Sequence, residues 1–177
     1  AGANVGQFAQ NLRSFYTGEI ISFEPVTDIF MKLKNIAHCD LKWHIYNVAL
    51  GSENKKVMVN ILEESSLSSI LKPNNYSVKR FGNDARIKQR EEVKLVRLDS
   101  LLKDLVENVE HRRIFLKMDT QGYDLEVLKG SIGIKDYIVA IQSEISLMPI
   151  YEGMPHWEES LSFYEGLGFK IVGMFPV

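Results

Sequence analysis

The residues that could do chemistry begin in the first turn of the chain, where Gly2 and Gly6 enclose Ala-Asn-Val. Glycine lets a backbone turn tightly and come close to a ligand. Glu24 follows the apolar run from Ile20 to Phe23, which predicts a strand with an acid at its carboxyl end. A glycine loop, a helix N-terminus and a carboxylate in this place can hold a nucleoside, with the acid accepting hydrogen bonds from ribose hydroxyls. Gly2, Asn4, Gly6 and Glu24 therefore predict a nucleoside cofactor site.

The spacing of the loop distinguishes between two cofactors. A dinucleotide fingerprint requires glycines at its first, third and sixth positions, but these places hold Gly2, Asn4 and Gln7. A nicotinamide-dependent oxidoreductase is thus the disfavoured alternative on the same fold. The order of loop, helix, strand and acid resembles instead the first motif of S-adenosylmethionine (SAM) methyltransferases, whose cofactor has no pyrophosphate.

A second group of polar residues is expected at the same edge of the sheet. Asp119 ends the apolar strand 114–118, and Lys117 faces the same way because side chains alternate along a strand. Ligands bind in this place in open α/β sheets, although a Lys-Asp pair can also simply satisfy itself. Glu144 ends a later apolar run. Asp119 and Glu144 are the first candidates for a catalytic base, and His156, in the loop that follows, is the third. Asp119 is also expected to contact the cofactor, because it lies next to the mouth where the glycine loop opens.

The stretch from Leu41 to Gly51 predicts a strand whose carboxyl end lies beside Glu24. Asn47 and Ala49 are therefore expected near the adenine of the cofactor. Asn47 could equally satisfy the end of the strand with its side-chain amide. Tyr151 and His156 could contact the substrate, because they lie in a loop after a strand end.

Alternating helices and strands must position these residues, which predicts an α/β fold with a Rossmann-like, doubly wound and mostly parallel sheet. The run 137–145 is expected to be a strand buried on both faces, because it is almost continuously apolar. Apolar spacing predicts a helix with a buried stripe of Phe8, Leu12 and Phe15. Further helices are expected after Pro25, from Asp99 or Ser100, before Gly130 and after Pro155, and further strands at 55–61, 93–98 and 169–175.

Residues 63–92 show no sustained period and are rich in serine and asparagine. Long irregular insertions in compact domains are usually functional or mobile, so this one is a candidate lid over the substrate. The charged run 86–94 within it is expected to be a solvated face. Both ends of the chain are expected to be cut. A strand should precede the glycine loop, and a return strand should follow Phe175.

Length and composition predict one domain over residues 1–177, with 45% hydrophobic and 25% charged residues. The net charge of −2 provides no basic field for nucleic acid, and no apolar run is long enough to span a membrane. Cys39, the single cysteine, is expected to be a small buried residue, and no signal peptide is visible. These features favour a cytoplasmic protein, with no disulfide and no metal ligand cluster; they leave its oligomeric state open.

Four motifs resemble the FkbM-type SAM-dependent methyltransferases: G-A-N-x-G with Gln7 and Phe8, S-F-E-P at 22–25, N-V-A-L-G at 47–51, and L-K-M-D-T-Q-G-Y-D-L-E-V-L-K-G at 116–130. Q-S-E-I-S-L at 142–147 adds to the resemblance. This chain has Gln121 and Asp124 where many members carry D-V-E-G-x-E, and it lacks the usual acid before the loop.

The resemblance implies SAM as cofactor and O-methylation of a hydroxyl on a glycan or a polyketide-like small molecule. A hydroxyl is a weak acid, so a carboxylate or histidine near its oxygen should help the transfer. A domain that binds SAM without catalysis is a further alternative.

Overall fold

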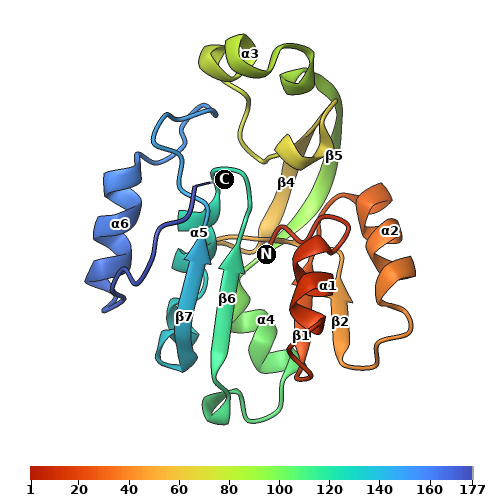
Figure 1. Cartoon of the computed structure of the whole chain (residues 1–177), viewed down its shortest axis with the longest axis vertical. Coiled ribbons are helices and arrows are strands. Elements are labelled where there is room, and N and C mark those ends of the chain that lie inside the picture. Colours follow the sequence, from red (N-terminus) through yellow and green to blue (C-terminus); the bar gives the residue numbers. More distant parts are fainter. Residues whose placement is uncertain (177) are drawn as a thin grey trace.

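The strands of this α/β chain form three short sheets in the computed structural model, which describes residues 1–176 (Figure 1). Two of the sheets are parallel pairs, and the third has the order β3-β5-β4, with β3 parallel and β4 antiparallel to β5. The described residues therefore do not build one continuous doubly wound sheet. The strands are β1 (Ile20–Phe23), β2 (Trp43–Tyr46), β3 (Ala49–Leu50), β4 (Lys55–Leu62), β5 (Ile87–Val96), β6 (Ile114–Met118) and β7 (Ile138–Ser143).

Helices flank the parallel pairs on both outer sides, with α2 beside β2 and α6 beyond β7 (Figure 1). The α-helices are α1 (Gln7–Arg13), α2 (Thr27–Ala37), α3 (Asn75–Phe81), α4 (Leu98–Leu105), α5 (Asp124–Lys129) and α6 (Trp157–Gly166). The short 3₁₀ helices are η1 (Ser65–Leu67), η2 (Gly82–Ala85), η3 (Val109–His111) and η4 (Ile132–Tyr137). Within residues 1–176, none of the helices has the length and apolar character needed to cross a bilayer.

The first three residues link the two parallel pairs. The Ala1 nitrogen donates to the Lys117 carbonyl at 2.7 Å, and the Ala1 carbonyl accepts from the Asp119 amide at 3.2 Å. The Ala3 amide donates to the Phe23 carbonyl at 3.0 Å. The backbone that carries the glycine loop is thus hydrogen-bonded to the carboxyl ends of both β1 and β6.

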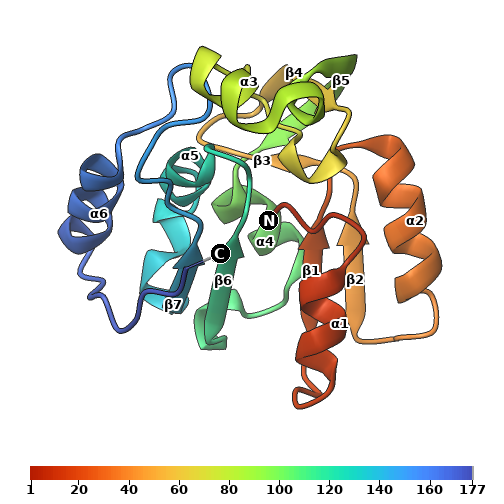
Figure 2. The same cartoon turned by 45° about the horizontal axis from the view of Figure 1, so that its top comes forward.

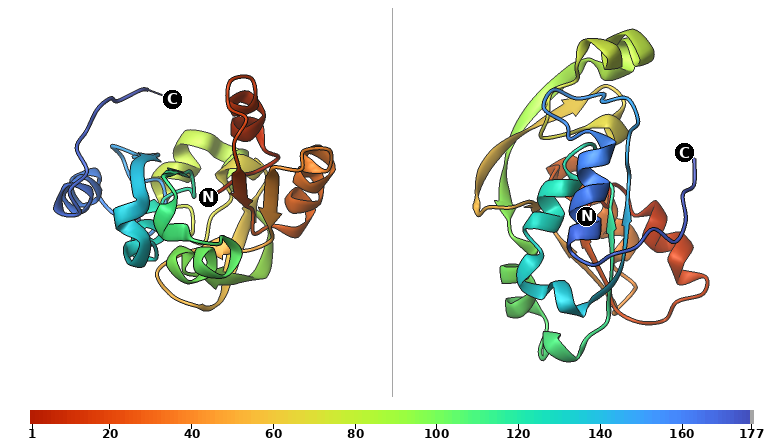
Figure 3. Two further views of the ribbon diagram at one scale, coloured as in Figure 1. Left: turned by 90° about the horizontal axis from the view of Figure 1, so that it is seen from below. Right: turned by 90° about the vertical axis from the view of Figure 1, so that its left-hand side faces the viewer.

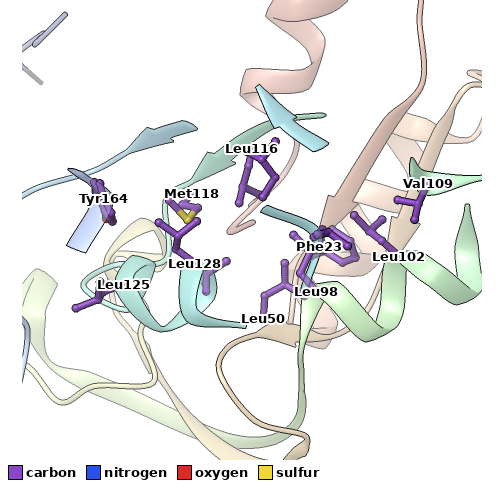
Figure 4. Packing of buried hydrophobic residues seen from close by; sticks show 13 residues of the cluster. Phe23, Leu50, Leu98, Leu102, Val109, Leu116, Met118, Leu125, Leu128 and Tyr164 are labelled. Carbon is purple, nitrogen blue, oxygen red and sulfur yellow. The ribbon is translucent and has the colours of Figure 1, made fainter. Parts of the chain in front are cut away.

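Within residues 1–176, the largest hydrophobic core lies between the strands β1 and β6 and the helices α4 and α5 (Figure 4). Phe23 of β1 and Met118 of β6 are buried in it, and each of them directly precedes an acid. Burial of each such side chain stabilises the fold by roughly 1.5–3 kcal/mol. The buried side chains thereby hold the neighbouring Glu24 and Asp119 in position. The other buried members are Leu50, Leu98, Leu102, Val109, Leu116, Leu125, Val127, Leu128, Ile134, Ile138 and Tyr164.

The segment 63–92 is more regular than its composition suggests. Its last residues begin β5, which pairs antiparallel with β4 over residues 55–62. Figure 3 shows this hairpin rising along one side of the molecule to α3. The charged run 86–94 is mostly exposed on β5, as expected for a solvated face. These charged residues form a strand because the backbone of β4 supplies their hydrogen-bond partners. Apolar periodicity in the sequence does not reveal such a pairing.

Three of the predicted strands differ from the structure: one is divided in two, one is partly exposed, and one is absent. The stretch 41–51 forms β2 and β3, which belong to different sheets and are separated by Asn47 and Val48. β7 is not buried on both faces, because Val139 is 51% exposed, and within residues 1–176 its one strand partner is β6. The residues after α6 form no strand up to residue 176, and most of them are exposed.

Three smaller predictions also failed. Phe8 and Phe15 do not form a buried stripe, since Phe15 lies beyond α1 and is 78% exposed, and Ala9 takes the buried side. Asp99 does not cap a helix; it lies inside α4, where its carboxylate accepts from Arg97 and from the Gly133 amide. Cys39 is exposed, because it lies in the turn that follows α2.

Candidate functional site

A cavity of about 840 Å³ opens at the carboxyl ends of β1 and β6, and Figure 2 shows α3 on the side of the molecule toward which these strands point. Gly2, Asn4, Glu24 and Ala49 line it, and so do the two candidate bases, Asp119 and Glu144. The structure therefore brings together residues that are as far as 142 positions apart in the sequence, Gly2 and Glu144. Gly6, Asn47 and His156 do not line this cavity.

The glycine loop passes directly over the end of β6. Gly2 has a φ of +67°, and a Cβ at this position would lie 1.8 Å from the Asp119 carbonyl oxygen. Only glycine fits here, because both its conformation and its contact exclude a side chain. Asn4 also has a positive φ, of 49°, and its side-chain oxygen accepts from the Val5 amide at 2.7 Å. Asparagine tolerates this conformation better than most residues.

Gly6 serves the loop from outside the cavity. It is the N-cap of α1 with a φ of +88°, and a Cβ would lie 2.8 Å from atoms of Leu33 and Trp43. The start of α1 can therefore pack closely on α2 and β2.

Glu24 is buried, with 5% of its surface exposed, and it holds the loop. Its carboxylate oxygens accept hydrogen bonds from the Asn4 amide at 2.9 Å and from the Val26 amide at 3.0 Å. Burial raises the pKa of Glu24, and the two amides oppose this by stabilising the charged form. The carboxylate thus connects the loop to the strand end and also lines the cavity.

Asn47 and Ala49 have different surroundings. The Asn47 side-chain amide donates to the carbonyls of Glu24 and Pro25, at 2.9 Å each, which is the strand-end role left open by the sequence. Ala49 is buried and lines the cavity.

Glu24→Gln should destabilise the fold measurably. A side-chain amide has one acceptor oxygen, so it would leave one of the two backbone donors facing an NH₂ group. A buried unsatisfied donor costs about 1–3 kcal/mol, which lowers Tm by roughly 3–10 °C in a chain of this length. Thermal unfolding followed by circular dichroism measures the shift, with the exposed Asp28→Asn as the control. Equal Tm values for both variants would mean that the two amide contacts contribute nothing.

A cation and two acids meet at the end of β6 and β7. The Lys117 ammonium lies 2.8 Å from the Asp119 carboxylate. The Gln121 side-chain amide donates to Asp119 at 3.2 Å and to Glu144 at 2.8 Å. Gln121 has a φ of +53°, a conformation that is rare outside glycine and that turns the chain sharply after β6. Its amide holds the two carboxylates side by side.

The two carboxyl groups titrate as a pair. Burial, together with the hydrogen bond to Asp119 and the charge of that residue, raises the pKa of Glu144 to about 7. Burial opposes ionisation of Asp119 as well, but hydrogen bonds from Glu144 and Lys117 outweigh it and lower the pKa of Asp119. The pair therefore holds one shared proton below about pH 7; above that pH both carboxyl groups are ionised, and the pair can accept one proton. Such a pair is suited to general base catalysis near neutral pH.

Asp124 was not among the residues predicted for the site, yet it positions Glu144. It is buried, and one carboxylate oxygen accepts from the Thr120 amide at 2.8 Å. The other accepts from the Ser143 hydroxyl at 2.8 Å and from the Glu144 amide at 3.0 Å. This carboxylate joins the turn after β6 to the end of β7. The signal in the sequence was the spacing of two acids around Gly122.

Neither Tyr151 nor His156 lines the cavity. Tyr151 is 2% exposed, and its hydroxyl lies within hydrogen-bond distance of two acceptors, the Leu67 carbonyl at 2.8 Å and the Gln121 side-chain oxygen at 2.9 Å. It therefore supports Gln121 from below. His156 precedes α6, is about half exposed, and lies 3.4 Å from Glu158. Within residues 1–176, no three His, Cys, Asp or Glu side chains gather as a metal site.

Comparison with known proteins gives one match. The family model described as the methyltransferase FkbM domain matches residues 1–171, which is nearly the whole chain. Neither a curated protein nor a solved structure matches the chain.

Proposed function

This chain belongs to the FkbM methyltransferase family, and from that premise we propose that it is a SAM-dependent methyltransferase that acts on a hydroxyl group. The acceptor is a glycan or a polyketide-like small molecule, and the cellular site is the cytoplasm. The fold is the Rossmann-like one of the class I methyltransferases. The parallel strands β1, β6 and β7 support this, because the residues at their carboxyl ends line one cavity, as in such a sheet.

One observation carries the proposal. Buried Glu24 faces the same cavity as the Asp119–Glu144 pair, with the glycine loop between them. An acid at the end of β1 suits ribose hydroxyls, and an acid pair at the end of β6 and β7 suits a proton transfer. A cofactor bound along the loop would thus have its reactive end near the pair.

The residues present fit this cofactor. Gly2 and Asn4 line the cavity at the loop, and the absence of a side chain at Gly2 lets this loop lie directly against the end of β6. Glu24 would hold the ribose, and Ala49 offers an apolar wall to the adenine. SAM would supply a methyl group already activated by the sulfonium charge. The chain then has to align the acceptor oxygen with the methyl carbon and remove its proton.

Asp119 and Glu144 take that proton in our account. The pair has lost its shared proton above about pH 7, and it can then accept the proton that leaves the acceptor hydroxyl as the new bond forms. Lys117, hydrogen-bonded to Asp119, and Gln121, hydrogen-bonded to both acids, hold the pair in place. Neither of them accepts a proton in this step.

The turnover number should rise with pH through about 7. The pKa of Glu144 is raised, so the pair holds its extra proton below pH 7 and cannot act as a base there. Turnover should fall about tenfold for each pH unit below that point and level off above it. Initial rates at saturating SAM and acceptor between pH 5.5 and 9 measure the profile. A flat profile over this range would contradict the assignment of the pair as base.

The cofactor can be tested separately from the acceptor. Calorimetric titration with S-adenosylhomocysteine (SAH) should show saturable binding, whereas NADH should show none. Incubation with methyl-labelled SAM and a panel of hydroxylated sugars and macrolide alcohols should then transfer label. Binding of NADH without SAH would instead support an oxidoreductase. Binding of SAH with no transfer to any member of the panel would support a non-catalytic domain.

A further inference from the structure

Part of the cavity lining has no place in the cofactor site just described. This part consists of Tyr76, Arg80 and Phe81 of α3, together with the serines of η1. In Figure 2 α3 lies in front of the β4–β5 hairpin, apart from the glycine loop. This portion is available to the methyl acceptor.

Arg80 is an unneutralised cation in this lining. Its guanidinium group lies over the Phe81 ring, 5.6 Å from the ring centre, an arrangement that holds the planar group in one orientation. Within residues 1–176, Arg80 forms no ion pair. Lys117, the other cation in the lining, is already paired with Asp119. Among the described residues that line the cavity, Arg80 is therefore the cation without an acidic partner, and it can bind an anion.

The neighbours of Arg80 suit a hydroxylated ring. Tyr76 lines the cavity and is 42% exposed, so part of its aromatic side chain is accessible to a ligand. Ser65 and Ser66 add hydroxyl groups to the same lining; that of Ser66 donates to the Glu64 carboxylate at 2.9 Å and can still accept a hydrogen bond. An aromatic face packs on the C–H face of a sugar ring, while hydroxyl groups exchange hydrogen bonds with its edge.

The charges of the cavity are separated along it. Glu24, Asp119 and Glu144 lie at the strand ends, whereas Arg80 lies on α3. A ligand with an anionic group is repelled from the acids and attracted to Arg80, so that its far end points toward the Asp119–Glu144 pair. The charge distribution thus favours one orientation of an acceptor in the cavity.

We propose that α3 forms an acceptor subsite for a hydroxylated ring that bears an anionic group, either phosphoryl or carboxylate, bound by Arg80 and stacked on Tyr76. The inference rests on the proposed function, since it names the acceptor class for the same cavity. The methylated hydroxyl is then on the side of the ring remote from the anionic group. Arginine is well suited to this task, because its fork of N–H groups binds phosphoryl and carboxylate groups bidentately.

The test uses the full chain loaded with SAH. Calorimetric titration with glucose 6-phosphate, glucuronate and glucose compares two anionic sugars with the matched neutral one. We expect at least one anionic sugar to bind at least tenfold more tightly than glucose, and the better of the two identifies the anionic group. Arg80→Ala should weaken that binding at least tenfold. Lys79→Ala removes an equal charge from the exposed neighbour on α3, which does not line the cavity, and should change nothing.

Titration of SAH into each variant separates this inference from the proposed function. Equal SAH affinity in wild type and Arg80→Ala is expected. The subsite is refuted if neither anionic sugar binds saturably, if both Arg80→Ala and wild type bind them equally, or if Arg80→Ala loses SAH instead. Failure of SAH to bind wild type would refute the proposed function itself.

Discussion

Replacing Asp119 with asparagine should lower the turnover number by about 10²–10⁴-fold, the usual contribution of a positioned general base. The substitution keeps the shape of the side chain but removes the charge beside Glu144, which is one of the causes of its raised pKa. The remaining activity should therefore reach its plateau at a lower pH than in wild type. SAH affinity should stay within about threefold, because the fold and the ribose acid are unchanged.

Two comparisons make the result specific to the acid pair. Asp136→Asn removes an exposed carboxylate that pairs with Lys135, and it should leave turnover unaltered. Glu144→Gln removes the group with the raised pKa, so its residual rate should lose the inflection near pH 7. Unchanged turnover in Asp119→Asn would remove this residue from the catalytic site, as would a loss of SAH binding equal to the loss of turnover.

Gly2→Ala should disable the cavity without a change in its charged groups. The added Cβ would lie 1.8 Å from the Asp119 carbonyl oxygen; the Cβ is fixed to the loop backbone and the oxygen belongs to the backbone of residue 119, so the loop must move by more than an ångström. A displacement of this size at a site that aligns reacting groups costs about 10²-fold in rate. We expect SAH affinity and turnover to fall together, because the loop carries the amide that Glu24 holds. Calorimetry and initial rates measure the two effects.

Gly153→Ala is the matched control for backbone strain. Gly153 has a φ of +71°, close to the +67° of Gly2, but a Cβ there would meet nothing within 4 Å. Both variants bear the cost of about 1–2 kcal/mol for a left-handed residue with a side chain. Only Gly2→Ala bears the collision as well. If both variants bound SAH alike, the close approach of the loop to β6 would have no role in cofactor binding.

The parts of the fold that the sequence predicted well are those with local signals. The glycines predict the loop, the apolar run predicts β1, and the acid that follows this run is Glu24; none of these signals depends on a tertiary contact. Lys117 and Asp119 were expected on the same face because strand side chains alternate, and their 2.8 Å contact confirms it.

The parts that failed depend on partners distant in the sequence. The apolar run of β7 predicts a fully buried strand. Its exposure depends on which elements of the fold pack against it, and within residues 1–176 its one strand partner is β6. β5 is hydrogen-bonded to β4 along its charged residues, and this pairing makes a strand of a segment too charged to show an apolar period. Phe8 lies on the surface, where its ring stacks with Phe115 and lies beneath the Lys117 ammonium.

The site shows the same division. Candidate acids could be chosen from strand ends, but the raised pKa of Glu144 depends on burial beside Asp119, which no single segment reveals. Gln121 and Asp124 position the pair through contacts between β6, α5 and β7. In the sequence they were visible only as departures from a common motif. Side chains of α3 line the cavity because the paired strands β4 and β5 carry α3 between them, and this pairing was not predicted from the sequence.

A crystal structure of the protein with SAH bound would test the central claim most directly. The account predicts that the ribose hydroxyls lie within hydrogen-bond distance of the Glu24 carboxylate, with the sulfur atom toward Asp119 and Glu144. SAH bound elsewhere, or bound with its ribose remote from Glu24, would contradict it.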